Sequence, residues 1–137
     1  MNYDHARSYL LSKPEAFEDF PFGPDVAVMK IKDKMFATLA LDTTGMYQSL
    51  LRSESQKPLA CMNLKCDPDD ALFFRNQFEG IHPGYHMNKR HWITLDFNSD
   101  VPESLIFELI DDSYELVVKG LRKKDREMLM SIQNESS

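Results

Sequence analysis

The chain has 137 residues, 42% of them hydrophobic and 28% charged, with a formal net charge of −6 and a pI near 5.1. This length suits a single domain with an ordinary core, and the aromatic content argues against a disordered chain. The acidic balance argues against a protein that binds nucleic acid through its overall charge. The sequence has no secretory signal and no apolar run long enough to span a membrane. We therefore expect a cytoplasmic protein, with a monomer favoured.

Alternating apolar residues predict the strands of a sheet. The segments with this alternation are 26–32, 35–41, 59–65 and 89–97. The first two form a hairpin around the turn at Asp33. Residues 17–24 hold three phenylalanines, two prolines and one glycine, and we expect a loop held by its aromatic side chains. Residues 42–58 are expected to form a polar connection with one helical turn over 46–51.

Apolar residues at helical spacing predict helices elsewhere. The segments with this spacing are 2–12, 67–79 and a long stretch from 103 to 133. Asp67 is placed to cap the second helix, and Gly80 to end it. A capping box begins at Asp100, and the same spacing recurs at Asp112. The last stretch is therefore predicted to break near Asp112 and again at Gly120.

The element order is thus α-β-β-β-α-β-α-α, and its short connections favour an α+β fold with an antiparallel sheet and helices on one side. We expect one domain over residues 1–133 and a disordered tail over residues 134–137. Charge is uneven along the chain. Residues 96–118 hold seven acids and no Lys or Arg, whereas residues 119–126 hold five bases and one acid. This polarity predicts a polarised surface.

Catalytic patterns are missing from the sequence, which favours a protein that is not an enzyme and needs no cofactor. Cys61 and Cys66 lie five residues apart on opposite faces of a strand and its exit, so we expect reduced, partly buried thiols. His82, His86 and His91 are the best metal candidates. A Pro-Gly turn separates the first two, and no acidic or cysteine ligand lies nearby in sequence, so no metal site is predicted.

The richest stretch for recognition is 81–95, where Lys89, Arg90 and His91 precede Trp92 and follow Tyr85. If the strand alternation begins at Arg90, the side chains of Arg90 and Trp92 share one face. Such a face, if open, could stack a base on the aromatic ring and neutralise phosphates. The alternative is that Trp92 lies in the core and Arg90 covers it.

The same alternation places Thr94 on the face of Trp92, and Ile93 and Leu95 with His91 on the other. A second basic group lies near the end of the chain and consists of Lys119, Arg122, Lys123 and Lys124. Cations near the carboxyl end of a helix are favoured by its dipole whatever the function, so this group has a structural explanation too.

Three strings in this chain resemble the YjbR/MmcQ-like family. They are Lys34-Met35-Phe36-Ala37, the run from Tyr85 to Ile93, and Ser113-Tyr114-Glu115-Leu116-Val117 followed by Leu121-Arg122-Lys123-Lys124. The resemblance covers nearly the whole chain. Asp33 stands where the family often has glycine, which leaves the type of hairpin turn open.

The resemblance implies a compact fold similar to CyaY (frataxin) and to type III secretion chaperones. It also implies a DNA-binding role, proposed for the family from a double-wing arrangement. Under that proposal Lys89, Arg90 and His91 are the candidate contacts, and the second basic group touches the nucleic-acid backbone. Two alternatives stay open: a protein- or peptide-binding adaptor, and a small-molecule pocket lined by Tyr85, Trp92 and Tyr114.

Overall fold

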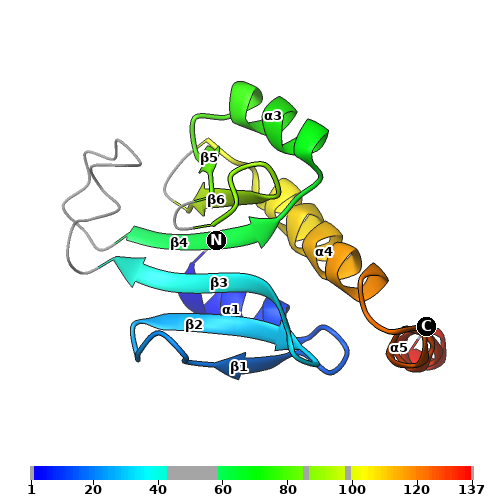
Figure 1. The fold of residues 1–137 in the computed structure, drawn as a ribbon. Coiled ribbons are helices and arrows are strands. Elements are labelled where there is room, and N and C mark those ends of the chain that lie inside the picture. Colours follow the sequence, from blue (N-terminus) through cyan, green and yellow to red (C-terminus); the bar gives the residue numbers. More distant parts are fainter. Residues whose placement is uncertain (1, 43–58, 85–86, 98–99, 137) are drawn as a thin grey trace.

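The computed structural model describes residues 2–42, 59–84, 87–97 and 100–136, and in these it shows four helices and one six-stranded antiparallel sheet (Figure 1). The strands are β1 (Phe17–Asp19), β2 (Val26–Ile31), β3 (Lys34–Asp42), β4 (Leu59–Lys65), β5 (Ile81–Pro83) and β6 (Trp92–Asp96). The helices are α1 (Tyr3–Leu11), α3 (Pro68–Gln77), α4 (Glu103–Lys119) and α5 (Lys123–Ser136). The strands lie in the order β1-β2-β3-β4-β6-β5. The predicted α+β class is confirmed.

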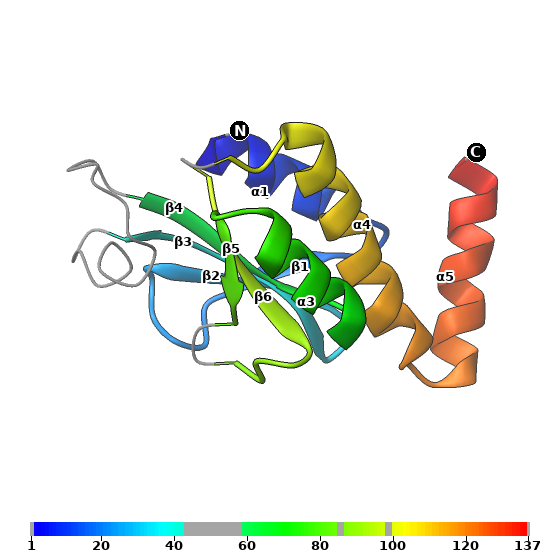
Figure 2. The ribbon, with the colours of Figure 1, turned by 90° about the horizontal axis from the view of Figure 1, so that it is seen from above.

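The core lies between one face of the sheet and the helices α1 and α4, which lie side by side on that face (Figure 2). Alternate residues of β2, β4 and β6 lie in it, as the alternation predicts, whereas in β3 the adjacent Phe36 and Ala37 both do. The fully buried strand residues of this core are Ala27, Met29, Ile31, Phe36, Ala37, Leu39, Met62, Leu64, Ile93 and Leu95. No helix of the described residues is long and apolar enough to cross a membrane.

A serine hydroxyl links α4 to the sheet. The β3–β4 ladder ends at the pair Ala37 and Leu64, and beyond it the side chain of Ser113 bridges the two strands. The Ser113 hydroxyl donates to the Phe36 carbonyl at 2.5 Å and accepts from the Lys65 N–H at 2.9 Å. Ser113 is fully buried, so this polar contact is shielded from water.

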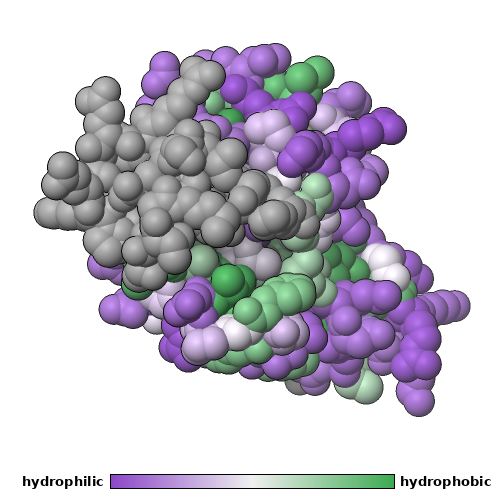
Figure 3. Space-filling model, turned by 60° about the vertical axis from the view of Figure 1, so that its left-hand side comes forward, coloured by the Kyte–Doolittle hydropathy of each residue, from purple (hydrophilic) through white to green (hydrophobic). Residues whose placement is uncertain are grey.

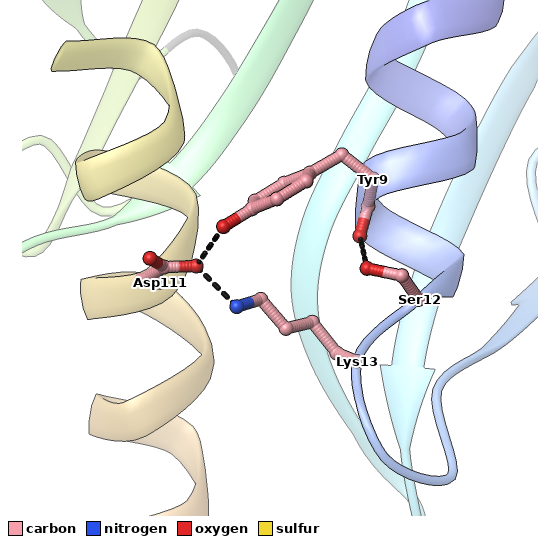
Figure 4. A network of polar contacts seen from close by, with 4 residues as sticks. All are labelled: Tyr9, Ser12, Lys13 and Asp111. Atoms are coloured by element: carbon pink, nitrogen blue, oxygen red, sulfur yellow. Dashed lines mark hydrogen bonds and ion pairs between the residues drawn. The ribbon is translucent and has the colours of Figure 1, made fainter. Parts of the chain in front are cut away.

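A second polar contact ties α1 to α4 (Figure 4). The Tyr9 hydroxyl donates to a carboxylate oxygen of Asp111 at 2.7 Å, and the Lys13 ammonium is paired with the same oxygen. That ammonium also lies 4.9 Å from the centre of the Tyr9 ring, a cation–π distance. The pKa of Tyr9 is raised, first by its burial and then by its hydrogen bond to Asp111. The contact thus links the carboxyl-terminal end of α1 and the residues just after it to α4.

Two short strands were not predicted. Residues 17–24 were expected to be a loop, but Phe17–Asp19 forms β1 and pairs with β2. A turn in which the Ala16 N–H donates to the Lys13 carbonyl at 3.0 Å sends the chain back along the sheet. Ion pairing of Asp19 with Lys30 at 2.8 Å supports the pairing. The other strand, β5, includes a proline and is also only three residues long.

The helix predictions need three corrections. α3, which begins at Pro68 and is capped by Asp67 as predicted, ends at Gln77 rather than at Glu79. The reason is that the backbone N–H groups of Glu79 and Gly80 donate to the carboxylate of Asp100, at 3.0 and 2.9 Å. Asp100 therefore does not cap the next helix, which begins after Pro102 with no side-chain cap.

The break predicted at residues 112–115 is also wrong, because α4 runs unbroken to Lys119. Its buried residues keep helical spacing through this region, so packing against the sheet decides the structure there. The interruption at Gly120 is confirmed. α5 then extends to Ser136, three residues into the segment expected to be disordered.

The hairpin turn between β2 and β3 has its unusual backbone at Lys32, which has φ +55°, and not at Asp33. Asp33 therefore does not need the freedom of glycine. Cys61 and Cys66 are both buried, at 4% and 6% exposure, more deeply than the partly buried thiols that were expected. The predicted connection over residues 42–58 lies outside the described residues except for residue 42, which ends β3.

Candidate nucleic-acid interface

The connection from β5 to β6 is built on a close approach at Gly84. The Gly84 N–H donates to the Trp92 carbonyl at 2.9 Å. A Cβ atom added at Gly84 would lie 2.7 Å from the Cβ of Trp92 and 3.0 Å from its carbonyl oxygen. Glycine is therefore required here for space. Tyr85 and His86, which follow it, lie outside the described residues.

Asn88 shapes the turn that comes next. Its side-chain oxygen accepts from the Arg90 N–H at 2.9 Å, and its carbonyl accepts from the His91 N–H at 3.2 Å. Asparagine commonly shapes turns through hydrogen bonds of this kind. The His91 carbonyl then accepts from the Cys66 N–H at 2.7 Å, which ties the turn to the end of β4. The backbone of the turn is thus held at several points.

The side chains of the turn point outward. Lys89, Arg90 and His91 are exposed, and they precede β6 rather than belonging to it. The Lys89 ammonium donates to the Gly84 carbonyl at 3.1 Å. Arg75, on α3, donates to the Lys89 carbonyl at 3.5 Å and brings a further cation to the turn. We call the group Arg75, Lys89, Arg90 and His91 the basic turn.

Within the part of the chain that the structure describes, no carboxylate forms an ion pair with any residue of the basic turn. Several other basic residues differ. Arg7, Lys13, Lys30 and Lys32 each have a carboxylate partner. The charge of the basic turn is therefore available to an external anion.

The alternation predicted for Arg90, Trp92 and Thr94 holds only in part. Ile93 and Leu95 are fully buried in the core, as expected for the other face. Thr94 is also buried, 1% exposed, and its hydroxyl donates to the side-chain oxygen of Asn63 at 2.5 Å. Trp92 is half-buried, between the two alternatives. The face that Trp92 and Thr94 share is thus not an open platform along its length.

The second basic group lies at the junction of α4 and α5. Lys119 is the last residue of α4, and Lys123 and Lys124 begin α5. All are exposed, as is Arg122. Two of these cations have carboxylate partners on α5: Arg122 is 3.4 Å from Asp125, and Lys123 is 4.0 Å from Glu127. These partners reduce the net charge of the group.

The β2–β3 turn lies across from this junction. A half-open hollow of about 790 Å³ separates them and is lined by Lys32, Asp33, Lys34, Gly120, Leu121, Arg122 and Asp125. Three of its side chains are cationic and two are anionic. The hollow is thus close to neutral.

Carboxylates lie between the basic turn and the second basic group. A hollow of about 240 Å³ is lined by Lys65, Cys66, Asp67, Asp70, Phe74, Leu109, Asp112, Glu115, Leu116 and Lys119. Burial raises the pKa of Asp112, and the neighbouring carboxylates Asp111 and Asp70 raise it further. Burial likewise raises the pKa of the Cys66 thiol to about 12, so it stays protonated and unreactive. Because these carboxylates lie between them, the basic turn and the second basic group form two separate positive areas on the surface.

Arg75 could not be found from the sequence, because it lies in a helix 14 residues before its contact at Lys89. Among the described residues, no three His, Cys, Asp or Glu side chains gather in a way that could hold a metal ion. The described residues do not form the expected small-molecule pocket between Trp92 and Tyr114. Tyr114 is buried in the core, where its hydroxyl donates to the Pro14 carbonyl at 2.7 Å.

The fold and the site define a small α+β domain with one twisted antiparallel sheet, a helical layer and an exposed basic turn. The family model YjbR matches residues 11–116. The chain belongs to the YjbR family. The resemblance seen in its sequence is thereby confirmed, and α5 lies outside the matched region.

Similar curated proteins and solved structures agree with this family assignment. The uncharacterised protein YbdF of Escherichia coli O157:H7 is 37% identical over 124 residues, 90% of each chain. The uncharacterised protein YjbR of Escherichia coli K12 is 26% identical over 132 residues, 96% of this chain and 100% of that one. The crystal structure of Deinococcus radiodurans protein DR2400 has a TM-score of 0.74 at 32% identity and covers 92% of this chain and 86% of that one. A Pseudomonas syringae crystal structure has a TM-score of 0.73 at 32% identity, covering 85% and 98%.

Proposed function

We propose that this protein is a non-enzymatic module that binds nucleic acid through the basic turn. The observation that supports this most is the exposed position of Lys89 and Arg90 beside Arg75, with no carboxylate paired to them in the described part of the chain. A cation that already has a carboxylate partner would gain little binding energy from a phosphate. Lys89 and Arg90 have no such partner among the described residues, so a phosphate can replace the water around them.

The roles follow from the geometry. The Arg90 guanidinium has five N–H donors in a planar fork, which suits two oxygens of one phosphate. Lys89 is anchored to the Gly84 carbonyl at 3.1 Å and supplies a second positive charge close by. Trp92 is half-buried, so the part of it that stays exposed would contact a base or sugar. Contacts of this kind read charge and shape more than sequence.

The second basic group would contribute less. Asp125 and Glu127 offset part of its charge, and the carboxylate-lined hollow separates it from the basic turn. Together with the net charge of −6, this predicts modest affinity that weakens steeply with salt. A bound nucleic-acid strand would therefore follow the basic turn and would not extend across the molecule to α5.

The test is a salt titration. Fluorescence anisotropy of a labelled single strand and a labelled duplex, each of about 20 nucleotides, is measured from roughly 20 to 200 mM salt. Replacing both Lys89→Ala and Arg90→Ala should flatten the slope of log K against log salt by about two units, because roughly one counterion is released per phosphate contact.

The matched control is Lys123→Ala with Lys124→Ala, which removes the same charge from α5. We expect it to change the slope by less than about one unit. Thermal unfolding shows that each variant is folded. The proposal fails if the wild-type protein does not bind at low salt, or if both double variants change the slope equally.

A further inference from the structure

Exposed carboxylates lie directly beside the basic turn. The Cys66 N–H donates to the His91 carbonyl at 2.7 Å, and α3 begins two residues after Cys66. Near the other end of this helix, Arg75 donates to the Lys89 carbonyl at 3.5 Å. The helix therefore runs alongside the turn. Its cap and two residues of its first turn are acidic and exposed, and these are Asp67, Asp69 and Asp70.

These three carboxylates form no ion pair with another described residue. Four carboxylates and two ammonium groups line the hollow of about 240 Å³ on this side of the turn. Burial, and then the charges of Asp70, Asp67 and Asp112, raise the pKa of the Cys66 thiol, whereas Arg75 lowers it. Because such effects fall off with distance, the carboxylates and the Arg75 cation lie near one another. An anion that binds at the basic turn therefore also meets negative charge.

The basic turn itself carries few charges. Arg75, Lys89 and Arg90 supply its fixed positive charges over about 10 Å, since a four-residue turn spans about 7 Å and the side chains extend it. A duplex carries about six phosphates over that length, because it has one negative charge per about 1.7 Å, and a single strand carries about three. The cations of the turn can thus match the phosphates of a single strand but not those of a duplex.

The surface on the α3 side of the turn mainly presents polar groups. Figure 3 shows the surface at the top of the molecule, where α3 lies, as mostly hydrophilic. A duplex is stiff over about 150 base pairs, so it cannot bend away from the carboxylates, whereas a single strand can. The excess phosphates of a duplex would then face more carboxylates than ammonium groups.

Trp92 adds a second reason to favour a single strand. It directly follows the basic turn at the start of β6, and its side chain is half-buried. Aromatic side chains bind single strands because an unpaired base can stack on them. In a duplex each base is already stacked and paired, and extracting it costs free energy. The exposed part of Trp92 can therefore contact a base of a single strand but not one inside the stack of a duplex.

We propose that the basic turn selects single-stranded over double-stranded nucleic acid, and that the carboxylates at the start of α3 and on α4 repel the duplex. This inference rests on the proposed function and narrows it to one class of nucleic acid. Discrimination of this kind depends on repulsion of the wrong ligand as well as on attraction of the right one. The contact is short, about three nucleotides, because the fixed cations of the turn match about that number of phosphates.

The first test compares one strand in two forms. A labelled strand of about 12 nucleotides and mixed sequence is titrated alone and as a blunt duplex with its complement, in roughly 50 mM salt, with fluorescence anisotropy as the readout. We expect the single strand to bind at least about fivefold more tightly. Equal binding, or tighter binding of the duplex, would overturn the inference and leave the proposed function standing. If neither form binds, both fail.

The second test removes carboxylates beside the turn. Asp70→Asn with Asp112→Asn takes away two negative charges and leaves the shape of the surface almost unchanged. We expect the affinity for the duplex to rise at least about threefold more than that for the single strand, because each charge acts on more phosphates of the duplex. Equal gains for the two forms, or no gain for either, would overturn the role of these carboxylates.

The matched control is Asp4→Asn with Asp25→Asn, which removes the same charge from positions away from the basic turn. Asp4 lies in α1, on the opposite side of the molecule from the β5–β6 connection in Figure 2. Asp25 precedes β2, which β3 and β4 separate from β6. We expect this pair to change the preference for the single strand by less than about 1.5-fold. Thermal unfolding shows that each variant is folded. A control that changes the preference as much as the first pair would overturn the inference, because overall charge would then decide it.

Discussion

Ser113 offers the sharpest test of how α4 is fixed to the sheet. The hydroxyl lies where the β3–β4 ladder ends, and it satisfies both the Phe36 carbonyl and the Lys65 N–H. Ser113→Ala removes one oxygen atom and leaves the apolar packing almost unchanged. Two backbone groups then lose their partner in a place where Ser113 itself is 0% exposed.

The size of the effect follows from these two groups. A buried donor or acceptor left without a partner costs about 1–3 kcal/mol. The Lys65 N–H is only partly buried, so water can recover part of its loss. We therefore expect Ser113→Ala to lower the free energy of unfolding by about 2–4 kcal/mol. For a domain of this length, that corresponds to a fall in Tm of roughly 6–16 °C.

Urea unfolding followed by circular dichroism measures the change directly. Ser104→Ala is the matched control, since Ser104 is exposed in the first turn of the same helix. We expect it to change stability by no more than about 0.5 kcal/mol. A loss below about 1 kcal/mol for Ser113→Ala, similar to the control, would refute the bridging role.

Three further outcomes follow from the structure. Gly84→Ala should lower the free energy of unfolding by about 1–3 kcal/mol in a thermal melt, because the new Cβ would press on Trp92. Tyr9→Phe should lower it by about 1 kcal/mol, because the hydrogen bond to Asp111 is lost. Asp112→Asn should raise Tm at neutral pH, since the raised pKa of Asp112 means that its charged form destabilises the folded state. This gain should shrink as the pH falls and the wild-type carboxyl becomes protonated.

Each of these outcomes has a contrary result. A Gly84→Ala protein with wild-type Tm would show that the connection to β6 shifts at no cost. An unchanged Tm in Tyr9→Phe would mean that the hydroxyl is equally well solvated in the unfolded chain. For Asp112→Asn, a gain in Tm that is the same in neutral and in mildly acidic buffer would exclude the electrostatic explanation.

The long strands could be predicted because their signal is local. Alternation over six or more residues marks β2, β3 and β4. The strands β1 and β5 could not be predicted, because three residues are too few to show the alternation of a strand. Their pairing depends on where the rest of the sheet lies.

The same contrast between local signals and distant contacts applies to the candidate site. Lys89 and Arg90 stand out in the sequence because they are adjacent and lie just before His91 and Trp92. Arg75 could not be found in that way, since only the packing of α3 brings it to the turn. Asp100 shows the converse: its spacing suits a capping box, but its carboxylate binds the chain after α3 instead. Local rules cannot choose between two partners when one is distant in sequence.

The most direct test of the nucleic-acid proposal is an NMR titration of the labelled protein with a short oligothymidylate at low salt. Binding at the basic turn predicts amide shifts at residues 87–91 and at the Arg75 side chain, all of which disappear in Arg90→Ala. Shifts confined to residues 119–124 or to β1, or no shifts at all, would contradict the account.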